Sequence, residues 1–187
     1  MVQTASKLLT LDEFLQLPET KPAQEYIGGK IIQKPMPQGK HSKIQWDLLT
    51  AINGHVIPLR LAHAFPELRC TFGDRSIVPD IVVLLWERIP LDENGEIADV
   101  VKTYPDWTIE ILSPGQSQTK VTSNILHCLD YGCSLGWLID PEERSVLVFP
   151  PRQQPSIFYN QGYLLPTPDF LGDLKLTVGQ IFGWLKL

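Results

Sequence analysis

Two acidic residues, Asp80 and Glu110, stand in the two most apolar stretches of the sequence. Asp80 directly precedes an aliphatic run at 81–85, and Glu110 lies within Trp-Thr-Ile-Glu-Ile-Leu at 107–112. An unpaired carboxylate is costly to bury, so each acid needs a cation, backbone donors or a metal ion. If the two stretches are neighbouring strands, the carboxylates converge on a hard divalent cation such as Mg²⁺, and the carbonyl of Ile111 adds a third protein oxygen.

Structural roles for the same acids are also open. Asp80 can accept hydrogen bonds from backbone amides at a strand edge, and Glu110 can form an ion pair with Lys120 or Arg75. His41, at the start of a predicted helix, is either a phosphate contact or a polar helix-start residue. The lysines near it either face phosphate or form a solvated rim; they are Lys30, Lys34, Lys40 and Lys43.

The elements that must position these residues follow from apolar periodicity. The most regular is an amphipathic helix at 41–57, where apolar residues recur at spacings of three and four. Further helices are predicted at about 10–17, 119–131 and 178–185, a hairpin at 25–32, and strands at 69–72, 76–86, 107–112, 135–140 and 144–149. The order strand, helix, strand between 107 and 140 predicts a right-handed crossover. We therefore expect an α/β (α+β) fold with a mixed central sheet flanked by helices.

Length and composition favour one domain over residues 1–187, with a short N-terminal helix and hairpin. The chain is 43% hydrophobic and 20% charged, and no apolar run approaches the roughly 20 residues that cross a bilayer. Residues 1–7 lack the features of a secretory signal, so we expect a cytoplasmic protein. The net charge of −5 argues against coating DNA without sequence preference, and any nucleic-acid contact needs a local basic patch.

The three cysteines do not form a recognisable site. Cys70, Cys128 and Cys133 contain no C-x-x-C pair. This spacing supports neither a disulfide framework nor a structural zinc site, and Cys128 is expected in a helix core.

Three motifs follow one another along the sequence: Val-Pro-Asp at 78–80, Ile-Glu-Ile-Leu-Ser-Pro at 109–114 and Gly-Trp-Leu-Ile-Asp-Pro at 136–141. This ordered set resembles the Uma-type restriction endonuclease family, a branch of the PD-(D/E)xK nuclease superfamily. The resemblance runs from about Thr10 to the C-terminus, and Glu25 and His41 also match family positions.

The resemblance implies a restriction-endonuclease-like fold and Mg²⁺-dependent hydrolysis of DNA phosphodiester bonds, with Mn²⁺ as a possible substitute. Asp80 and Glu110 would hold the metal, with Glu25 adding to the site. A homodimer suits an enzyme that cuts both strands of a duplex.

One position departs from the superfamily pattern. Leu112 stands where the motif has lysine, two residues after the acid. The family commonly carries a basic residue on the following helix instead, four residues before a tyrosine, and that position here is His127 before Tyr131. Lys120 is the other candidate for assisting the attacking water, and we prefer it. The alternative is a catalytically inactive nuclease-fold protein that acts as a nucleic-acid-binding or assembly module.

Overall fold

The computed structural model describes residues 9–186. The segment 1–7, on which the expectation of a missing secretory signal rests, lies outside the described residues. None of the helices within 9–186 is long and apolar enough to span a membrane.

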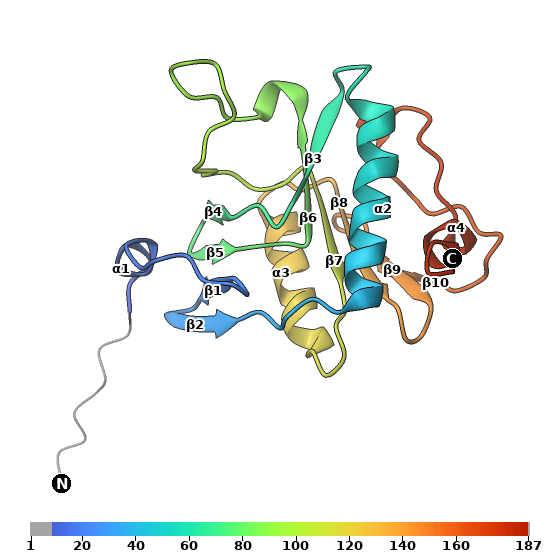
Figure 1. Ribbon diagram of the computed structural model, residues 1–187, viewed down its shortest axis with the longest axis horizontal. Coiled ribbons are helices and arrows are strands. Elements are labelled where there is room, and N and C mark those ends of the chain that lie inside the picture. Colours follow the sequence, from blue (N-terminus) through green and yellow to red (C-terminus); the bar gives the residue numbers. More distant parts are fainter. Residues whose placement is uncertain (1–8, 187) are drawn as a thin grey trace, which may run out of the picture.

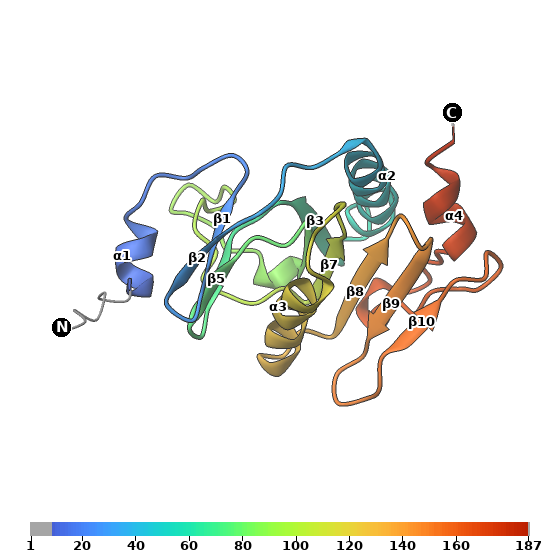
Figure 2. The ribbon, with the colours of Figure 1, turned by 90° about the horizontal axis from the view of Figure 1, so that it is seen from below.

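The strands of the described chain form two sheets (Figures 1 and 2). The larger sheet has the spatial order β10-β9-β8-β7-β6-β3, and all neighbours are antiparallel except β7 and β8. Its strands are β3 (Ala62–Pro66), β6 (Ile81–Leu85), β7 (Trp107–Ile111), β8 (Leu135–Asp140), β9 (Ser145–Phe149) and β10 (Ser156–Phe158). The sheet is therefore mixed, as expected from the sequence.

The smaller sheet is antiparallel and has the order β2-β1-β5-β4. Its strands are β1 (Gln24–Ile27), β2 (Lys30–Gln33), β4 (Cys70–Phe72) and β5 (Arg75–Ile77). Gly28 and Gly29 both have positive φ in the β1–β2 turn, which glycine adopts without steric cost. The predicted hairpin is confirmed.

Four α-helices lie within the described residues, near the predicted positions: α1 (Leu11–Leu15), α2 (Gly39–Val56), α3 (Gln118–Asp130) and α4 (Val178–Gly183). Short 3₁₀ helices follow β6 (Trp86–Arg88) and precede α4 (Asp169–Leu171). Thr10 and Glu13 form a capping box at the start of α1. Helix α3 connects the parallel strands β7 and β8, as the strand-helix-strand pattern predicts.

The larger sheet is covered on both faces. Helix α2 packs its buried side chains Ile44, Leu48 and Ile52 against one face, and α4 extends this core. Helix α3 covers part of the other face through Val121 and Ile125. The remainder of that face meets the smaller sheet. Residues on that second face thus lie between α3 and the smaller sheet.

The predicted strand at 76–86 is wrong in its extent. The chain breaks at 78–80, so that β5 belongs to the smaller sheet and β6 to the larger one. Pro79 has no N–H to donate to a sheet, and the amide of Val78 instead donates to the carboxylate of Glu25. The segment carrying Asp80 is therefore the crossing point between the two sheets.

Candidate active site at the junction of the two sheets

The register of β6 and β7 places Asp80 opposite Glu110. Ile81 pairs with Ile109 and Val82 with Thr108 in this antiparallel ladder. One further step along the same register sets residue 80 against residue 110, and opposed residues of an antiparallel pair point to the same face. Both side chains are buried, each with 2% of its surface exposed. The sequence expectation that the two acids converge is consistent with this geometry.

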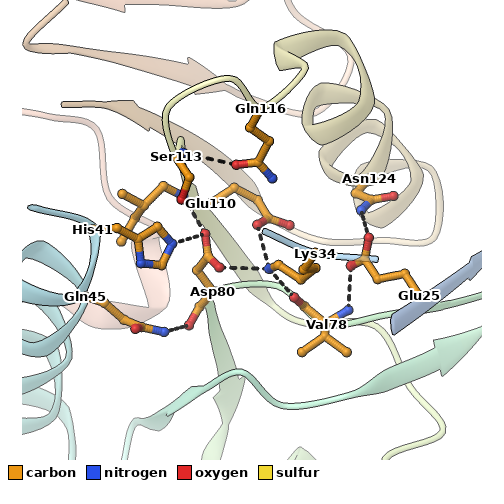
Figure 3. A network of polar contacts seen from close by, with 11 residues as sticks. Glu25, Lys34, His41, Gln45, Val78, Asp80, Glu110, Ser113, Gln116 and Asn124 are labelled. Atoms are coloured by element: carbon orange, nitrogen blue, oxygen red, sulfur yellow. Dashed lines mark hydrogen bonds and ion pairs between the residues drawn. The ribbon is translucent and has the colours of Figure 1, made fainter. Parts of the chain in front are cut away.

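Asp80 is held by contacts on both carboxylate oxygens (Figure 3). Its Oδ2 accepts from the Ile111 amide at 2.7 Å and lies 3.1 Å from Nε2 of His41. Its Oδ1 accepts from Nζ of Lys34 at 2.8 Å. The backbone carbonyl of Asp80 accepts from the side-chain amide of Gln45 at 2.8 Å. Helix α2, strand β7 and the smaller sheet thus all fix this one residue.

Lys34 is the cation between the two acids. It directly follows β2, and its Nζ lies 2.8 Å from Oδ1 of Asp80, 3.5 Å from Oε2 of Glu110 and 2.6 Å from the carbonyl of Val78. The side chain is largely buried, with 12% exposed. The expected partners of Glu110, Lys120 or Arg75, are therefore not its partner here, and Lys34 is not part of a solvated rim.

Glu25 forms a second anchor next to this pair. Its Oε1 accepts from the Val78 amide at 2.8 Å, and its Oε2 accepts from Nδ2 of Asn124 at 3.0 Å. Glu25 is buried on β1, and Asn124 is buried on α3. The carboxylate thus links the smaller sheet, the crossing segment and α3.

The charges of the cluster are strongly coupled. Burial raises the pKa of Glu110 well above its usual value, because the stabilising charge of Lys34 is opposed by Asp80 and Glu25. Burial also disfavours the charged form of Asp80, but Lys34 and His41 outweigh it and lower the Asp80 pKa. Likewise, burial alone would lower the pKa of Lys34, and the surrounding carboxylates raise it instead. Lys34 is thus cationic, Asp80 anionic, and Glu110 inclined to hold a proton.

Two other predicted residues lie beside the cluster. His41 is buried, and its Nδ1 has no hydrogen-bond partner among residues 9–186 while its Nε2 faces Asp80. Lys43 forms an ion pair with Asp47 on the same helix. Of the two, only His41 contacts the acids in the described structure.

The two basic residues predicted to replace the motif lysine occupy different surroundings. Lys120 borders the same cavity as Glu25 and Glu110. His127 is buried, its ring stacks on Phe72 with centroids 4.7 Å apart, and its Nε2 lies 3.3 Å from the Phe72 carbonyl. Burial lowers the pKa of His127. The structure therefore places Lys120 on the cavity that Glu110 lines, and gives His127, about two turns further along α3, a packing role against Phe72.

Two cavities open on the cluster. A cavity of about 330 Å³ reaches Glu25, Glu110 and Lys120, and another of about 510 Å³ reaches His41 and Asp80. Lys34 lines both cavities. The side chain of Lys34 therefore forms part of the wall between them.

The donor set fits a hard divalent cation. Three buried carboxylates share one buried lysine, so the cluster carries an excess of oxygen ligands of the kind that Mg²⁺ and Mn²⁺ prefer. No group of three or more His, Cys, Asp and Glu residues within 9–186 is arranged to hold a metal as it stands. Lys34 accounts for this, because its ammonium occupies the space between Asp80 and Glu110. The Ile111 amide faces Asp80, whereas a ligand role for the Ile111 carbonyl stays a prediction.

Sequence reasoning did not single out Lys34, Asn124 or Gln45. One weak signal pointed to Lys34. It lies two residues after Ile32, so strand alternation places both side chains on the same face, but several other lysines lie nearby in the sequence. Asn124 falls at helical spacing from the buried Val121 and Cys128. A polar residue on an apolar helix face requires a buried partner, here Glu25.

Comparison with known proteins places the chain in a family. A search of curated proteins finds no match. One solved structure that matches is described as "a putative nuclease belonging to DUF820 from Anabaena variabilis ATCC 29413"; it is 61% identical, covers 94% of this chain and 98% of its own, and superposes with a TM-score of 0.92. The expected nuclease-like α+β fold is thereby confirmed. The model of the Uma2 family, described as "Putative restriction endonuclease", matches residues 11–179, and because this match spans most of the chain, the protein belongs to the Uma2 family.

Proposed function

We propose that the protein is a Mg²⁺-dependent endonuclease that hydrolyses DNA phosphodiester bonds, with Asp80 and Glu110 as the metal ligands. The observation that carries this proposal is the position of the two buried acids, Asp80 directly before β6 and Glu110 on the neighbouring β7, each lining a cavity. Membership of the family described as "Putative restriction endonuclease", and the likeness to a protein described as "a putative nuclease", support the reaction class.

A divalent ion held by these carboxylates supplies Lewis acidity toward water and phosphate oxygens. The protein's own residues then have distinct tasks. The Ile111 amide and His41 fix the Asp80 carboxylate, and Gln45 holds the backbone of Asp80. Glu25 holds the crossing segment through the Val78 amide, so that Asp80 keeps its place opposite Glu110.

Among the basic residues that could assist the reaction, Lys34 has the best support. Its ammonium already contacts both acids, whereas Lys120 borders the Glu110 cavity and His127 packs against Phe72. Lys120 remains suited to a phosphate contact at the edge of that cavity. With His127 held in an aromatic cluster, we assign it no part in the chemistry.

The partner and setting are proposed along the same lines. DNA reaches the acids through the two cavities, with His41 as a candidate phosphate contact; Lys43 is a weaker candidate because it is paired with Asp47. A homodimer would present two such sites to the two strands of a duplex. Sedimentation of the purified protein tests the dimer. We propose a cytoplasmic location, which fractionation of the native cells tests.

Nicking of supercoiled plasmid in Mg²⁺ or Mn²⁺ tests the function. The wild-type protein should nick, and chelation should abolish the activity. Asp80→Ala and Glu110→Gln should lose it, whereas Asp99→Asn, which changes an exposed acid bordering the Asp80 cavity, should retain it. Glu110→Gln is the more informative variant, because Glu110 already favours its neutral form and glutamine preserves its shape. An Asp80→Ala protein that nicks as well as the wild type contradicts the proposal.

The second candidate function is that of a non-catalytic nuclease-fold module. It rests on the absence of lysine at position 112, where this chain has Leu112. That protein would bind DNA in a mobility-shift assay and nick none under Mg²⁺, Mn²⁺ or Co²⁺. In such a module, Glu110→Gln should bind DNA as the wild type does, because no metal would take part in the binding.

A further inference from the structure

We propose that Lys34 acts as a built-in counter-cation that a divalent metal ion displaces: its ammonium bridges Asp80 and Glu110 in the metal-free protein and leaves them when the metal binds. This inference rests on the proposed function for the identity of the ligands, and it adds a role for a residue outside the family's motif positions.

The first support is the position of Nζ. It lies within 2.8 Å of one carboxylate and 3.5 Å of the other, in the space that a shared ligand of both acids must occupy. A divalent ion that contacts both carboxylates at about 2.0–2.6 Å therefore competes for the same volume. The two cations cannot both keep these contacts.

The second support is charge. Without Lys34, the buried carboxyl groups of Asp80 and Glu110 would lie together with no cation between them, which disfavours ionisation of both. Lys34 is the lysine or arginine that contacts Asp80 and Glu110 within residues 9–186. The metal-free site is consequently kept in shape by this lysine, which holds the acids apart and aligned.

The third support is the space into which the Lys34 side chain can move. Lys34 lines both cavities, so its flexible side chain borders open space next to the cluster. The backbone at this point is restrained, because Pro35 and Pro37 follow and the Lys34 amide donates to the Ala23 carbonyl at 2.9 Å. The exchange thus requires rotation of one side chain and leaves the ammonium beside the metal site.

The experiment is a calorimetric titration of Mn²⁺ into metal-stripped full-length proteins. Lys34→Met should bind Mn²⁺ roughly tenfold more tightly than the wild type, which corresponds to ~1.4 kcal/mol. Lys34→Arg keeps the charge and should show no such gain. Lys30→Met changes an exposed lysine at the start of β2 and should bind as the wild type does. In thermal unfolding, Mn²⁺ should raise the melting temperature of Lys34→Met more than that of the wild type.

If Lys34→Met does not fold without metal, the effect of losing Lys34 is measured in a protein that already carries Glu110→Gln. Lys34→Met/Glu110→Gln should bind Mn²⁺ more tightly than Glu110→Gln alone, because Asp80 is then released from its lysine. Equal or weaker Mn²⁺ binding on loss of Lys34, in the wild-type or the Glu110→Gln background, overturns the inference. So does a gain of equal size in Lys34→Arg.

These outcomes are separable from failure of the proposed function. A protein that nicks plasmid but shows no change of Mn²⁺ affinity on loss of Lys34 keeps its function and refutes the exchange. A protein that nicks nothing but shows the predicted gain refutes the endonuclease and keeps the exchange.

Discussion

Nζ of Lys34 lies 2.8 Å from Oδ1 of Asp80, although the two residues are 46 positions apart in the chain. This contact joins the end of the β1–β2 hairpin to the start of β6, and therefore joins the two sheets at the point where the acids meet. The candidate site is thus part of the packing between the sheets, so that stability and metal chemistry are linked there.

Asp80→Asn should destabilise the metal-free protein by about 3–5 kcal/mol, because it leaves the buried ammonium of Lys34 without its closest anion. Urea unfolding followed by circular dichroism measures this change. Asp99→Asn, at an exposed position, should stay within about 0.5 kcal/mol of the wild type. Equal stability of the two variants would show that the ion pair does not hold the sheets together.

Glu25→Gln should cost about 1–3 kcal/mol even though the side chain keeps its size. Both oxygens of Glu25 accept hydrogen bonds, from the Val78 amide and from Asn124, so a glutamine NH₂ must face one of these donors. Urea denaturation gives the loss. Asn124→Asp/Glu25→Gln should recover part of it, because the new carboxylate accepts from the glutamine. A double variant less stable than Glu25→Gln would argue against this pairing.

Gly136→Ala should destabilise the packing of α3 on β8. An added Cβ at residue 136 would lie 2.2 Å from Cγ2 of Ile125, and overpacking of this kind costs about 1–3 kcal/mol. Gly54→Ala is the matched control, since its Cβ meets no atom within 4 Å inside α2, and it should stabilise by about 0.5–1 kcal/mol. Thermal unfolding distinguishes them. The cost of Gly136→Ala should shrink in an Ile125→Ala background, and an unchanged cost would rule out that clash.

The variant His127→Phe should lose less stability than the wild type when the pH falls into the mildly acidic range. Burial lowers the pKa of His127 below its usual 6.5, so the unfolded chain takes up this proton at a higher pH than the folded protein does. The contribution of neutral His127 to the free energy of unfolding is therefore complete above about pH 7 and is lost as the pH falls through 6.5. Urea midpoints at pH 5, 6 and 7.5 should fall less for His127→Phe than for the wild type. Parallel curves would contradict the assignment.

Much of the site's framework could be predicted from local sequence patterns. The acids stand out because Asp80 and Glu110 interrupt apolar strands, and helix α2 has regular apolar spacing. Strand β3 was not predicted, since its Ala-His-Ala-Phe-Pro sequence has weak strand preference and the strand exists through its pairing with β6. Local patterns carry no information on such long-range pairing.

The break at 78–80 and the position of Lys34 are likewise tertiary effects. Glu25 takes the Val78 amide out of any ladder, and that interaction spans 53 residues. Lys34 looks like its neighbouring lysines until the two sheets come together around it. Sequence reasoning therefore found the two acids but proposed the wrong cation for Glu110.

Crystals of the wild-type protein soaked in Mn²⁺ test the central claim most directly, because an anomalous difference map locates the ion independently of activity. The predicted result is a peak within coordination distance of the carboxylates of both Asp80 and Glu110, absent from Glu110→Gln crystals soaked in the same way. A peak that avoids these two acids, or one that persists unchanged in Glu110→Gln, would contradict the account.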